Sequence, residues 1–380
     1  MKPPREPRSW FESLQSAMDD AIFFDARYIR VDHHDGISRF SVGLLTALAR
    51  VTKVVAIISD ERQLKLLPPE INHHKIHGPT SWLEPFTALR LNGLGAKIVY
   101  SPMQTMGTMG RRFKLVLTLH DLIYYRHPAP PPAMPAIVRI LWRLYHLSYW
   151  PQRWALNGAD AVATVSNTTK SLILRHKLTK RPVGVVYNAA GASHSLGSHP
   201  DRGRPAGNDL VYMGSFMGYK NVETLISAMS ELPNHNLHLL SKITPERKAQ
   251  LLALVKTDGG RVFFHNGVSE EKYHELLGSA LALVSASLDE GFGIPLVEAM
   301  SLGTPVVVSD IPIFHEIAGD SANYFAAEDD ADFARAVAKL DDKALWKVES
   351  LKAKARVGSY SWETSAQSLI ELLESVKLKP

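Results

Sequence analysis

The chain has 380 residues, of which 45% are hydrophobic and 21% are charged, and it contains no cysteine. This composition is typical of a globular protein long enough for two α/β domains, and it excludes disulfide scaffolds, thiolate chemistry and a disordered chain. No apolar run approaches the roughly 20 residues that cross a bilayer, and the first ten residues (MKPPREPRSW) lack the apolar core of a secretory signal. We therefore expect a cytoplasmic protein, or one held peripherally at the inner face of the membrane.

The net charge of +5 is unevenly distributed along the chain. Residues 1–200 carry 25 Lys and Arg against 13 Asp and Glu, whereas residues 201–380 carry 18 against 25. A basic N-terminal half favours an anionic partner, such as a membrane surface or a phosphorylated acceptor. Attraction between two oppositely charged halves explains the asymmetry equally well. A nucleic-acid partner is not expected, because the basic half carries no recognised binding motif.

Apolar segments rich in β-branched residues alternate with helical patterns along the whole chain. The predicted strands are residues 21–24, 54–59, 98–101, 115–119, 161–165 and 183–187, followed by 210–213, 237–240, 262–265, 281–285 and 305–309. Helical patterns fall between most of them, as at residues 39–50, 220–229 and 271–277. This alternation predicts an α/β protein with two doubly wound parallel sheets, each covered by helices on both faces.

A polar segment rich in Gly, Pro and Ser, residues 191–208, separates the two series of strands and is typical of an interdomain linker. We therefore predict an N-terminal domain of residues 1–190 and a C-terminal domain of residues 209–358. Doubly wound sheets bind ligands outside the carboxyl ends of their strands, so two such domains are expected to face each other across a cleft.

The strongest functional signal is S-A-S-L-D-E-G-F-G-I-P-L-V-E-A-M-S-L-G-T-P-V-V-V-S-D, residues 285–310. Glu290 lies in a loop after an apolar strand, and the two glycines that follow it allow the backbone to approach a ligand closely. Pro295 suits the first position of a helix, whose free amides and positive end favour a diphosphate. Glu290 and Glu298 could then accept hydrogen bonds from the hydroxyls of a sugar and of a ribose.

The spacing of Glu290 and Glu298, with G-F-G-I-P between them, resembles the E-x7-E signature of the family 4 retaining glycosyltransferases. The resemblance implies the GT-B fold, in which two Rossmann-like domains face each other across a cleft. It also implies that Glu290 and the following amides hold the donor sugar, and that Glu298 holds the ribose of the nucleotide. Two glutamates at this spacing can occur by chance, but the glycine loop and the flanking strands make the signature specific.

A second segment, V-Y-M-G-S-F-M-G-Y-K-N-V-E-T-L from residue 211 to 225, resembles the G-x-x-x-x-(R)K-N element of the same family. The resemblance implies that Lys220 neutralises the donor diphosphate as charge develops on the leaving group. The alternative is an exposed lysine at a helix start, where a cation is slightly unfavourable. Ser215 and Tyr219 stand where the family usually has an arginine, which leaves a catalytically silent nucleotide-sugar-binding protein open.

The N-terminal half carries weaker motifs at the ends of strands. D-G-I-S-R-F, from Asp35, resembles the glycine loop of the family, which implies that Gly36 approaches the phosphate or the acceptor and that Arg39 meets an anionic group. L-T-L-H-D resembles its H-D element, which implies that His120 contacts the donor sugar or the acceptor, while Asp121 orients it or caps the next segment. Ser166 and Asn188 either line the cleft or cap loops. The catalytic candidates are thus His120, Lys220 and Glu290; the donor-binding candidates are Gly36, Gly214, Ser215, Lys220, Glu290, Gly291, Phe292, Gly293, Ile294, Pro295 and Glu298; the acceptor or cleft candidates are Arg39, Asp121, Ser166 and Asn188.

Two further segments bear on partners. The C-terminal helix of residues 359–380 resembles the element of the family that crosses back to the N-terminal domain. Residues 136–156 (A-I-V-R-I-L-W-R-L-Y-H-L-S-Y-W-P-Q-R-W-A-L) combine cations with Trp and Tyr, and such a helix can lie among lipid headgroups. Packing of its aromatic residues on the N-terminal sheet is the alternative, and the sequence slightly favours it.

Together the resemblances imply a retaining hexosyltransferase of polysaccharide biosynthesis. It would move a sugar from a GDP- or UDP-linked donor to a glycan or lipid-linked acceptor. Mannose is favoured because S-F-M-G-Y-K-N and H-E-I-A-G-D-S-A-N-Y-F are similar to segments of bacterial mannosyltransferases. No acidic pair stands at a suitable strand end, so we expect no metal and no cofactor. A nucleotide-sugar epimerase or hydrolase on the same fold is the other enzymatic alternative.

Overall fold

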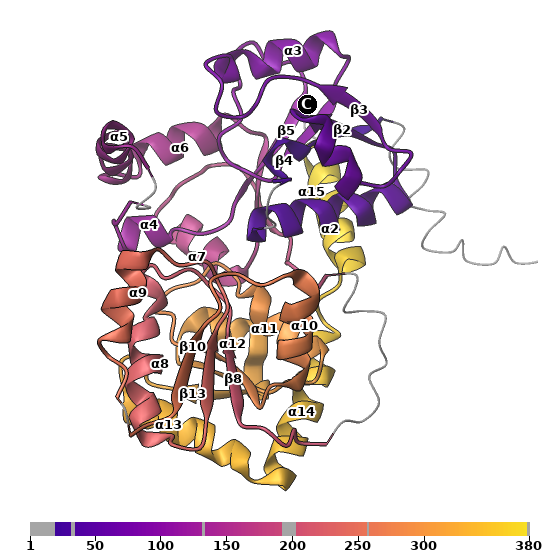
Figure 1. Ribbon diagram of the computed structural model, residues 1–380. Helices are drawn as coiled ribbons and strands as arrows, with labels where there is room; N and C mark the ends of the chain where they lie inside the picture. Colours follow the sequence, from indigo (N-terminus) through magenta and orange to yellow (C-terminus); the bar gives the residue numbers. More distant parts are fainter. Residues whose placement is uncertain (1–19, 32–34, 131–133, 192–202, 257, 378–380) are drawn as a thin grey trace, which may run out of the picture. The chain divides into compact units, whose positions relative to one another are not determined.

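The computed structural model describes residues 20–31, 35–130, 134–191, 203–256 and 258–377, which form two compact units (Figure 1). The first unit consists of the described residues within 1–121, 145–189 and 361–380. The second unit consists of the described residues within 122–144 and 190–360. These units differ from the predicted domains in residues 122–144, which join the second unit. Most of the predicted linker, and the N-terminal segment searched for a signal, lie outside the described residues.

The described part of the first unit contains a parallel sheet of seven strands in the order β3-β2-β1-β4-β5-β6-β7. Its strands are β1 (Ile22–Asp25), β2 (Val54–Ile58), β3 (Asn72–Lys75), β4 (Ile98–Ser101), β5 (Lys114–Leu119), β6 (Ala161–Thr164) and β7 (Val183–Val185). Its helices are α2 (Gly36–Val51), α3 (Thr87–Gly93), α6 (Trp150–Asn157), α7 (Asn167–Arg175) and α15 (Trp362–Lys377), with 3-10 turns η1 (Ala26–Tyr28), η2 (Glu61–Leu66) and η3 (Glu84–Phe86). Strands β1, β4 and β6 are buried along their whole length, as expected for a parallel sheet covered on both faces.

The described part of the second unit contains a parallel sheet of six strands in the order β10-β9-β8-β11-β12-β13. Its strands are β8 (Asp209–Tyr212), β9 (Asn236–Leu239), β10 (Arg261–Phe264), β11 (Ala282–Ser285), β12 (Val306–Ser309) and β13 (Ala322–Phe325). Its helices are α4 (Ile123–Arg126), α8 (Val222–Ala228), α9 (Pro245–Leu252), α10 (Glu270–Ser279), α11 (Ile294–Ser301), α12 (Pro312–Ala318), α13 (Asp330–Ala338) and α14 (Lys343–Val357), with 3-10 turns η5 (Gly218–Lys220), η6 (Met229–Glu231), η7 (Gly319–Ser321) and η8 (Lys339–Asp341). Helix α5 (Ala136–His146) continues from the second unit into the first. The fully buried Trp346 ties α14 to the sheet, because its Nε1 donates to the carbonyl of Leu281 at 2.8 Å.

The two predicted parallel sheets are confirmed, and each predicted strand overlaps an observed one. Strands β3 and β13 were not predicted. Strand β3 reads N-H-H-K and is largely exposed at the edge of its sheet, so it lacks the apolar signal by which a strand is recognised. No described helix is both long and apolar enough to cross a membrane.

Strand order reverses once in each sheet, between β1 and β4 in the first unit and between β8 and β11 in the second. At such a point the loops leaving two neighbouring strands turn to opposite faces of the sheet, which opens a crevice at their carboxyl ends. The residues that follow β1, β4, β8 and β11 are therefore the first places to look for a site.

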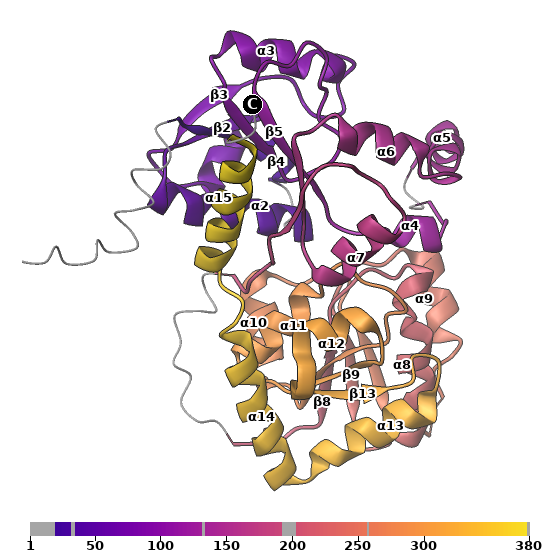
Figure 2. The ribbon, with the colours of Figure 1, turned by 180° about the vertical axis from the view of Figure 1, so that it is seen from behind.

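Helices α2 and α15 lie side by side in the first unit, as both views show (Figures 1 and 2). A Cβ atom on Gly43 of α2 would come within 2.2 Å of the Trp362 ring of α15. The absence of a side chain at Gly43 thus allows the C-terminal helix to pack closely on α2.

We expect Gly43→Ala to lower the free energy of unfolding by about 1–3 kcal/mol, because the added methyl overpacks this contact. Urea unfolding measures the change. Gly93→Ala is the matched control, because nothing lies within 4 Å of a Cβ there; it should leave stability unchanged or slightly raised. Equal stability of Gly43→Ala and wild type would contradict the packing described.

Candidate functional site

The loops that follow β8 and β11 meet at the reversal point of the second sheet. The backbone N–H of Leu288 in the second loop donates to the carbonyl of Tyr219 in the first at 2.8 Å. Lys220 and Glu290 then form an ion pair between the two loops. The predicted catalytic residues of the C-terminal half are therefore brought together by neighbouring strands.

The Glu290 carboxylate is held from two sides. Its Oε1 accepts a hydrogen bond from the Lys220 ammonium and another, of 3.0 Å, from the hydroxyl of Ser287. The Lys220 and Glu290 side chains are 14% and 15% exposed, so both remain within reach of a ligand. The pair is electrically neutral as it stands, and each partner satisfies the other in a partly dehydrated position.

Helix α11 begins directly beside Glu290. Its N-cap is Gly293, which has φ +96° and offers no side-chain hydrogen bond, and Pro295 follows in the first turn. Because the first amides of a helix have no partner within the helix, they and the helix dipole favour an anion here. Phe292 is buried and its ring lies edge-on to that of Tyr360 at 5.7 Å, which fixes the loop before Ile294.

Glu298 lies inside the second unit. It is 1% exposed, and its Oε2 accepts a hydrogen bond of 2.6 Å from the hydroxyl of Tyr273 on α10. The sequence correctly places it about one turn into α11, but its carboxylate is engaged within the protein. Contact with a ribose would require this carboxylate to become accessible, and the role stays a prediction.

Gly214 and Ser215 form the turn after β8. A Cβ on Gly214 would come within 2.6 Å of the Tyr212 hydroxyl, and that hydroxyl donates to the Ser215 carbonyl at 2.6 Å. Burial, followed by the charge of Glu290, raises the pKa of Tyr212 well above its usual value. Tyr212 thus stays protonated and holds this turn, while the side chain of Ser215 is exposed.

Sequence reasoning missed Arg126 and His127, the last residue and the C-cap of α4, which lie beside the second loop. Arg126 forms an ion pair with Asp289, the neighbour of Glu290; Asp289 is 4% exposed and Arg126 is 43% exposed. The His127 ring lies 5.8 Å from that of Tyr219, and burial, followed by the Arg126 charge, lowers the pKa of His127. No local pattern links a short helix at residue 126 with a loop at residue 289, so no sequence signal could have placed this cation.

His120 lies at the carboxyl end of β5 in the first unit. Its Nε2 is 2.7 Å from the carbonyl of Pro102, and its ring meets that of Phe40 edge-on at 5.1 Å. Burial lowers the pKa of His120, so the ring is neutral near pH 7. Because a carbonyl can only accept, the proton of the neutral ring sits on Nε2, and Nδ1 is the acceptor.

Four other predicted residues of the first unit fall at helix starts or loops. Gly36 begins α2, and Arg39 lies half-buried one turn later. Asp121 is half-buried next to His120. Ser166 is the N-cap of α7, because its hydroxyl accepts from the N–H of Thr169 at 3.0 Å, which favours the capping alternative.

Asn188 follows β7 and is 3% exposed. Its side-chain oxygen Oδ1 is buried and has no hydrogen-bond partner within the part of the chain that the structure describes. Burying an acceptor without a partner is unfavourable.

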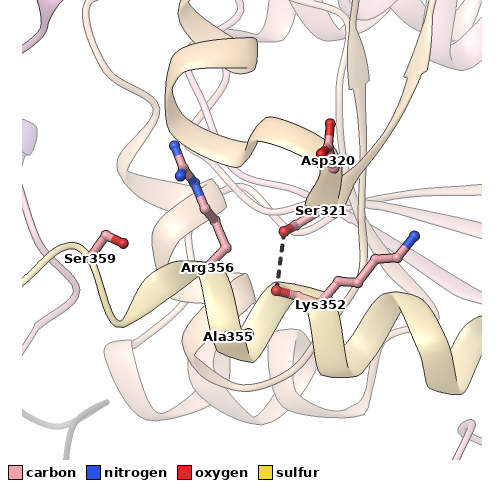
Figure 3. Close-up of a pocket in the computed structure, with 6 residues that line it drawn as sticks. All are labelled: Asp320, Ser321, Lys352, Ala355, Arg356 and Ser359. Carbon is pink, nitrogen blue, oxygen red and sulfur yellow. Dashed lines mark hydrogen bonds between the residues drawn. The ribbon is translucent and has the colours of Figure 1, made fainter.

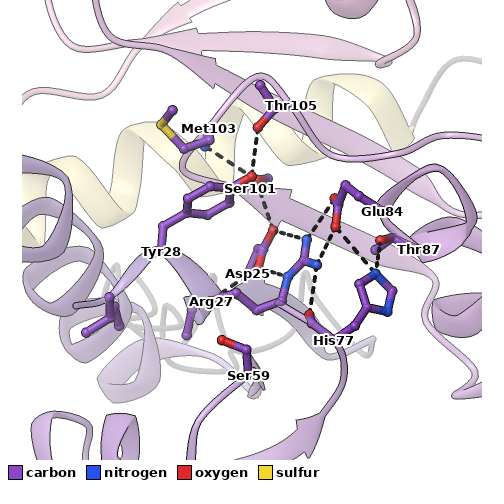
Figure 4. A network of polar contacts seen from close by, with 12 residues as sticks. Asp25, Arg27, Tyr28, Ser59, His77, Glu84, Thr87, Ser101, Met103 and Thr105 are labelled. Carbon is purple, nitrogen blue, oxygen red and sulfur yellow. Dashed lines mark hydrogen bonds and ion pairs between the residues drawn. The ribbon is translucent and has the colours of Figure 1, made fainter. Parts of the chain in front are cut away.

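The reversal point of the first sheet is filled by a buried ion network (Figure 4). Arg27 lies between two carboxylates, donating to Asp25 from Nε at 2.8 Å and to Glu84 from Nη1 at 2.7 Å. Ser101, at the end of β4, donates to Asp25 at 3.2 Å. The Arg27 side chain is fully buried, and its donors are all used inside the protein. This network joins β1, β4 and η3 rather than offering groups to a ligand.

A surface hollow of about 440 Å³ lies between α14 and η7 in the second unit (Figure 3). Two of its polar side chains bond to backbone carbonyls of the same unit: Ser321 donates to the Lys352 carbonyl at 3.1 Å, and Arg356 donates to the Ile317 carbonyl at 2.9 Å. None of its lining residues comes from the loops after β8 and β11. Among the residues that the structure describes, no group of three or more His, Asp or Glu side chains is placed to hold a metal ion.

Comparison with known proteins agrees with this geometry. Residues 201–375 match the family model of the glycosyl transferases group 1. The matched part is a little under half of the chain. It contains both loops of the candidate site, and the predicted resemblance to glycosyltransferases is confirmed.

Two curated relatives and one solved structure extend the comparison. The chain is 30% identical over 183 residues to an O-antigen chain mannosyltransferase of Salmonella typhimurium, covering 47% of this chain and 50% of the relative. It is 29% identical over 230 residues to a serotype-specific mannosyltransferase of Escherichia coli, covering 56% of this chain and 28% of the relative. The chain thus spans half or less of the length of these relatives. The Anabaena protein HepE, solved with UDP and glucose, superposes with a TM-score of 0.70 at 18% identity, covering 94% of this chain and all of HepE. The fold is GT-B, as predicted.

We expect the stability of the protein to fall below about pH 6.5 in part through His120. Its folded pKa is lowered, so the unfolded chain takes up a proton that the folded chain does not, and stability is lost as the pH falls. Urea unfolding of wild type and His120→Gln at pH 7.5 and 5.5 measures this contribution. The variant should lose less stability than wild type, by up to about 1 kcal/mol. An equal or greater loss in His120→Gln would show that the histidine is protonated in the folded protein.

Proposed function

We propose that this protein is a hexosyltransferase that takes its sugar from a nucleotide diphosphate donor. The observation that carries the proposal is the Lys220–Glu290 pair. It lies at the reversal point of a sheet that matches the group 1 glycosyltransferases, beside the N-terminus of α11, which no side chain caps. Mannose is the proposed sugar, because the two curated relatives are named as mannosyltransferases. The acceptor is a glycan or a lipid-linked sugar of a surface polysaccharide.

The donor would replace the internal ion pair with two better interactions. Its diphosphate offers Lys220 two phosphates in place of one carboxylate, and the amides of α11 add to the attraction. Glu290, released from Lys220, can accept hydrogen bonds from the hydroxyls of the sugar. The Leu288–Tyr219 backbone bond holds the two loops in place before the donor arrives, so only the side chains need to exchange partners.

The same groups account for the proposed retaining and metal-independent reaction. As the glycosidic bond breaks, negative charge grows on the β-phosphate, where Lys220 and the helix amides stabilise it as a metal ion does in other enzymes. The acceptor hydroxyl attacks on the face from which the phosphate leaves, and the phosphate takes its proton. Glu290 is proposed to position the sugar rather than to act as a catalytic acid or base, and His120 of the first unit remains a separate candidate for contact with the sugar or the acceptor.

Arg126 is proposed as the second cation of the site. Ser215 and Tyr219 provide no positive charge where relatives of this type usually carry arginine. The guanidinium of Arg126 is anchored by the buried Asp289 directly beside Glu290, yet is 43% exposed and so keeps donors toward solvent. A planar guanidinium suits the bidentate recognition of a phosphate. A donor diphosphate would then meet two cations.

The absence of the usual arginine also favours a second candidate, a protein that binds a nucleotide sugar without transferring it. Only a measurement of turnover separates the two. We propose the cytoplasm as its compartment, since a cysteine-free chain suits reducing conditions.

We expect release of the nucleoside diphosphate when the protein is given its donor and an acceptor glycan, tested with UDP-, GDP-, ADP- and dTDP-sugars. Turnover should persist in EDTA and fall at least about 100-fold in Lys220→Ala, since the cation acts on the charge that develops in the transition state. Binding without turnover by any donor would favour the silent protein. Turnover lost in EDTA and restored by Mg²⁺ would contradict metal independence.

We expect Arg126→Ala to weaken donor binding about tenfold, which corresponds to the loss of one charge-assisted hydrogen bond. Arg335→Ala is the matched control, because Arg335 is another exposed arginine of the second unit paired with an aspartate, Asp332, at 3.1 Å. Calorimetric titration with the preferred nucleotide sugar measures both. Equal affinities of the two variants would remove Arg126 from the site.

A further inference from the structure

Helix α5, labelled in Figures 1 and 2, turns an apolar face toward solvent. Ile137, Ile140, Leu141 and Leu144 are 70%, 57%, 61% and 56% exposed, and no residue of the helix is buried. Their spacing of three, four and seven positions places them on one face, which we call the α5 face. An amphipathic helix normally turns such a face to the core, so α5 shows the opposite arrangement.

The helix is held from another side. The Trp142 ring is half-buried and meets the ring of Tyr124 edge-on at 5.0 Å, which anchors α5 within the second unit. Trp142 lies about 100° or more around the helix from each member of the α5 face, given 3.6 residues per turn. The contacts that hold the helix therefore leave this face uncovered.

The segment of the chain that contains α5 carries charges of one sign only. No Asp or Glu occurs from Leu122 to Ala159, whereas that segment carries Arg126, Arg139, Arg143 and Arg153. Arg139 and Arg143 are exposed and lie one turn apart on α5. Exposed indole rings follow in α6, where Trp150 and Trp154 are 68% and 71% exposed. An uncovered apolar face on a helix that carries exposed cations, followed along the chain by exposed indoles, is a combination that suits a lipid headgroup layer.

We propose that the α5 face docks onto the surface of a bilayer that carries anionic headgroups. The four aliphatic side chains enter the boundary between headgroups and acyl chains. Arg143 flanks the face and meets the lipid phosphates, and Arg139 adds to the positive charge of the helix. Eleven residues of helix are about 16 Å long, which is too short to cross the hydrocarbon core, so α5 lies along the surface. A second copy of this chain fits less well, because a symmetric contact would bring the two arginine pairs together. The inference does not depend on the proposed transferase activity.

The test is sedimentation of the full chain with vesicles in the absence of donor and acceptor. Vesicles of phosphatidylcholine alone are compared with vesicles that contain about one third phosphatidylglycerol, at low and at high salt. Wild type should bind the anionic vesicles at least tenfold more tightly than the neutral ones, and added salt should weaken that binding. The double variant Ile140→Ser, Leu141→Ser should lose binding at least tenfold, and Arg139→Gln, Arg143→Gln should lose the preference for anionic lipid.

The matched control is Leu174→Ser, Leu252→Ser, which removes leucines that are 55% and 46% exposed on α7 and α9. It should bind vesicles as wild type does, and all variants should match wild type in circular dichroism and melting temperature. Failure of wild type to bind anionic vesicles at low salt would overturn the proposal, as would undiminished binding by the α5 double variant. A lipid-free dimer dissociated by that variant would assign the face to a second copy instead.

Discussion

The ion pair between Lys220 and Glu290 connects two loops that are 70 residues apart in the chain. The pair can form because β8 and β11 are neighbours in a parallel sheet, so their carboxyl ends deliver both loops to one edge. The Leu288–Tyr219 backbone bond and the Ser287 hydroxyl then fix the geometry. Two opposite charges in a partly dehydrated crevice must satisfy each other or a ligand, and this requirement supports the proposal that the crevice is a binding site.

The charged residues at the reversal points of the two sheets differ in how many hydrogen-bond partners they have within the protein. In the first unit, Arg27 is fully buried and its donors are all taken by Asp25, Glu84 and the His77 carbonyl. Exchange of these partners for a ligand would leave charges uncompensated inside the protein, which is strongly unfavourable. In the second unit, Lys220 and Glu290 have fewer partners and retain some exposure. The number of hydrogen-bond partners within the protein therefore separates a network that supports the sheet from a pair that is proposed to exchange partners with a donor.

Much of this arrangement could be predicted from the sequence, because its signals are local. Apolar segments rich in β-branched residues predicted the central strands. Glu290 and the two glycines that follow it predicted the loop before α11. The polar edge strand β3 carries no such signal. The burial of Glu298 depends on the Tyr273 hydroxyl of a different helix, and the position of Arg126 depends on a contact with Asp289, 163 positions away. The amphipathic pattern of α5 predicts two faces, but only tertiary structure decides which of them is covered.

Hydrogen–deuterium exchange of the full chain, with and without saturating GDP-mannose or UDP-glucose, tests the central claim most directly. The account predicts slower exchange of the backbone amides in residues 213–221 and 286–296 with one of these donors, and loss of that protection in Glu290→Gln. Unchanged exchange in both segments with either donor would contradict it, as would protection confined to the hollow beside Arg356.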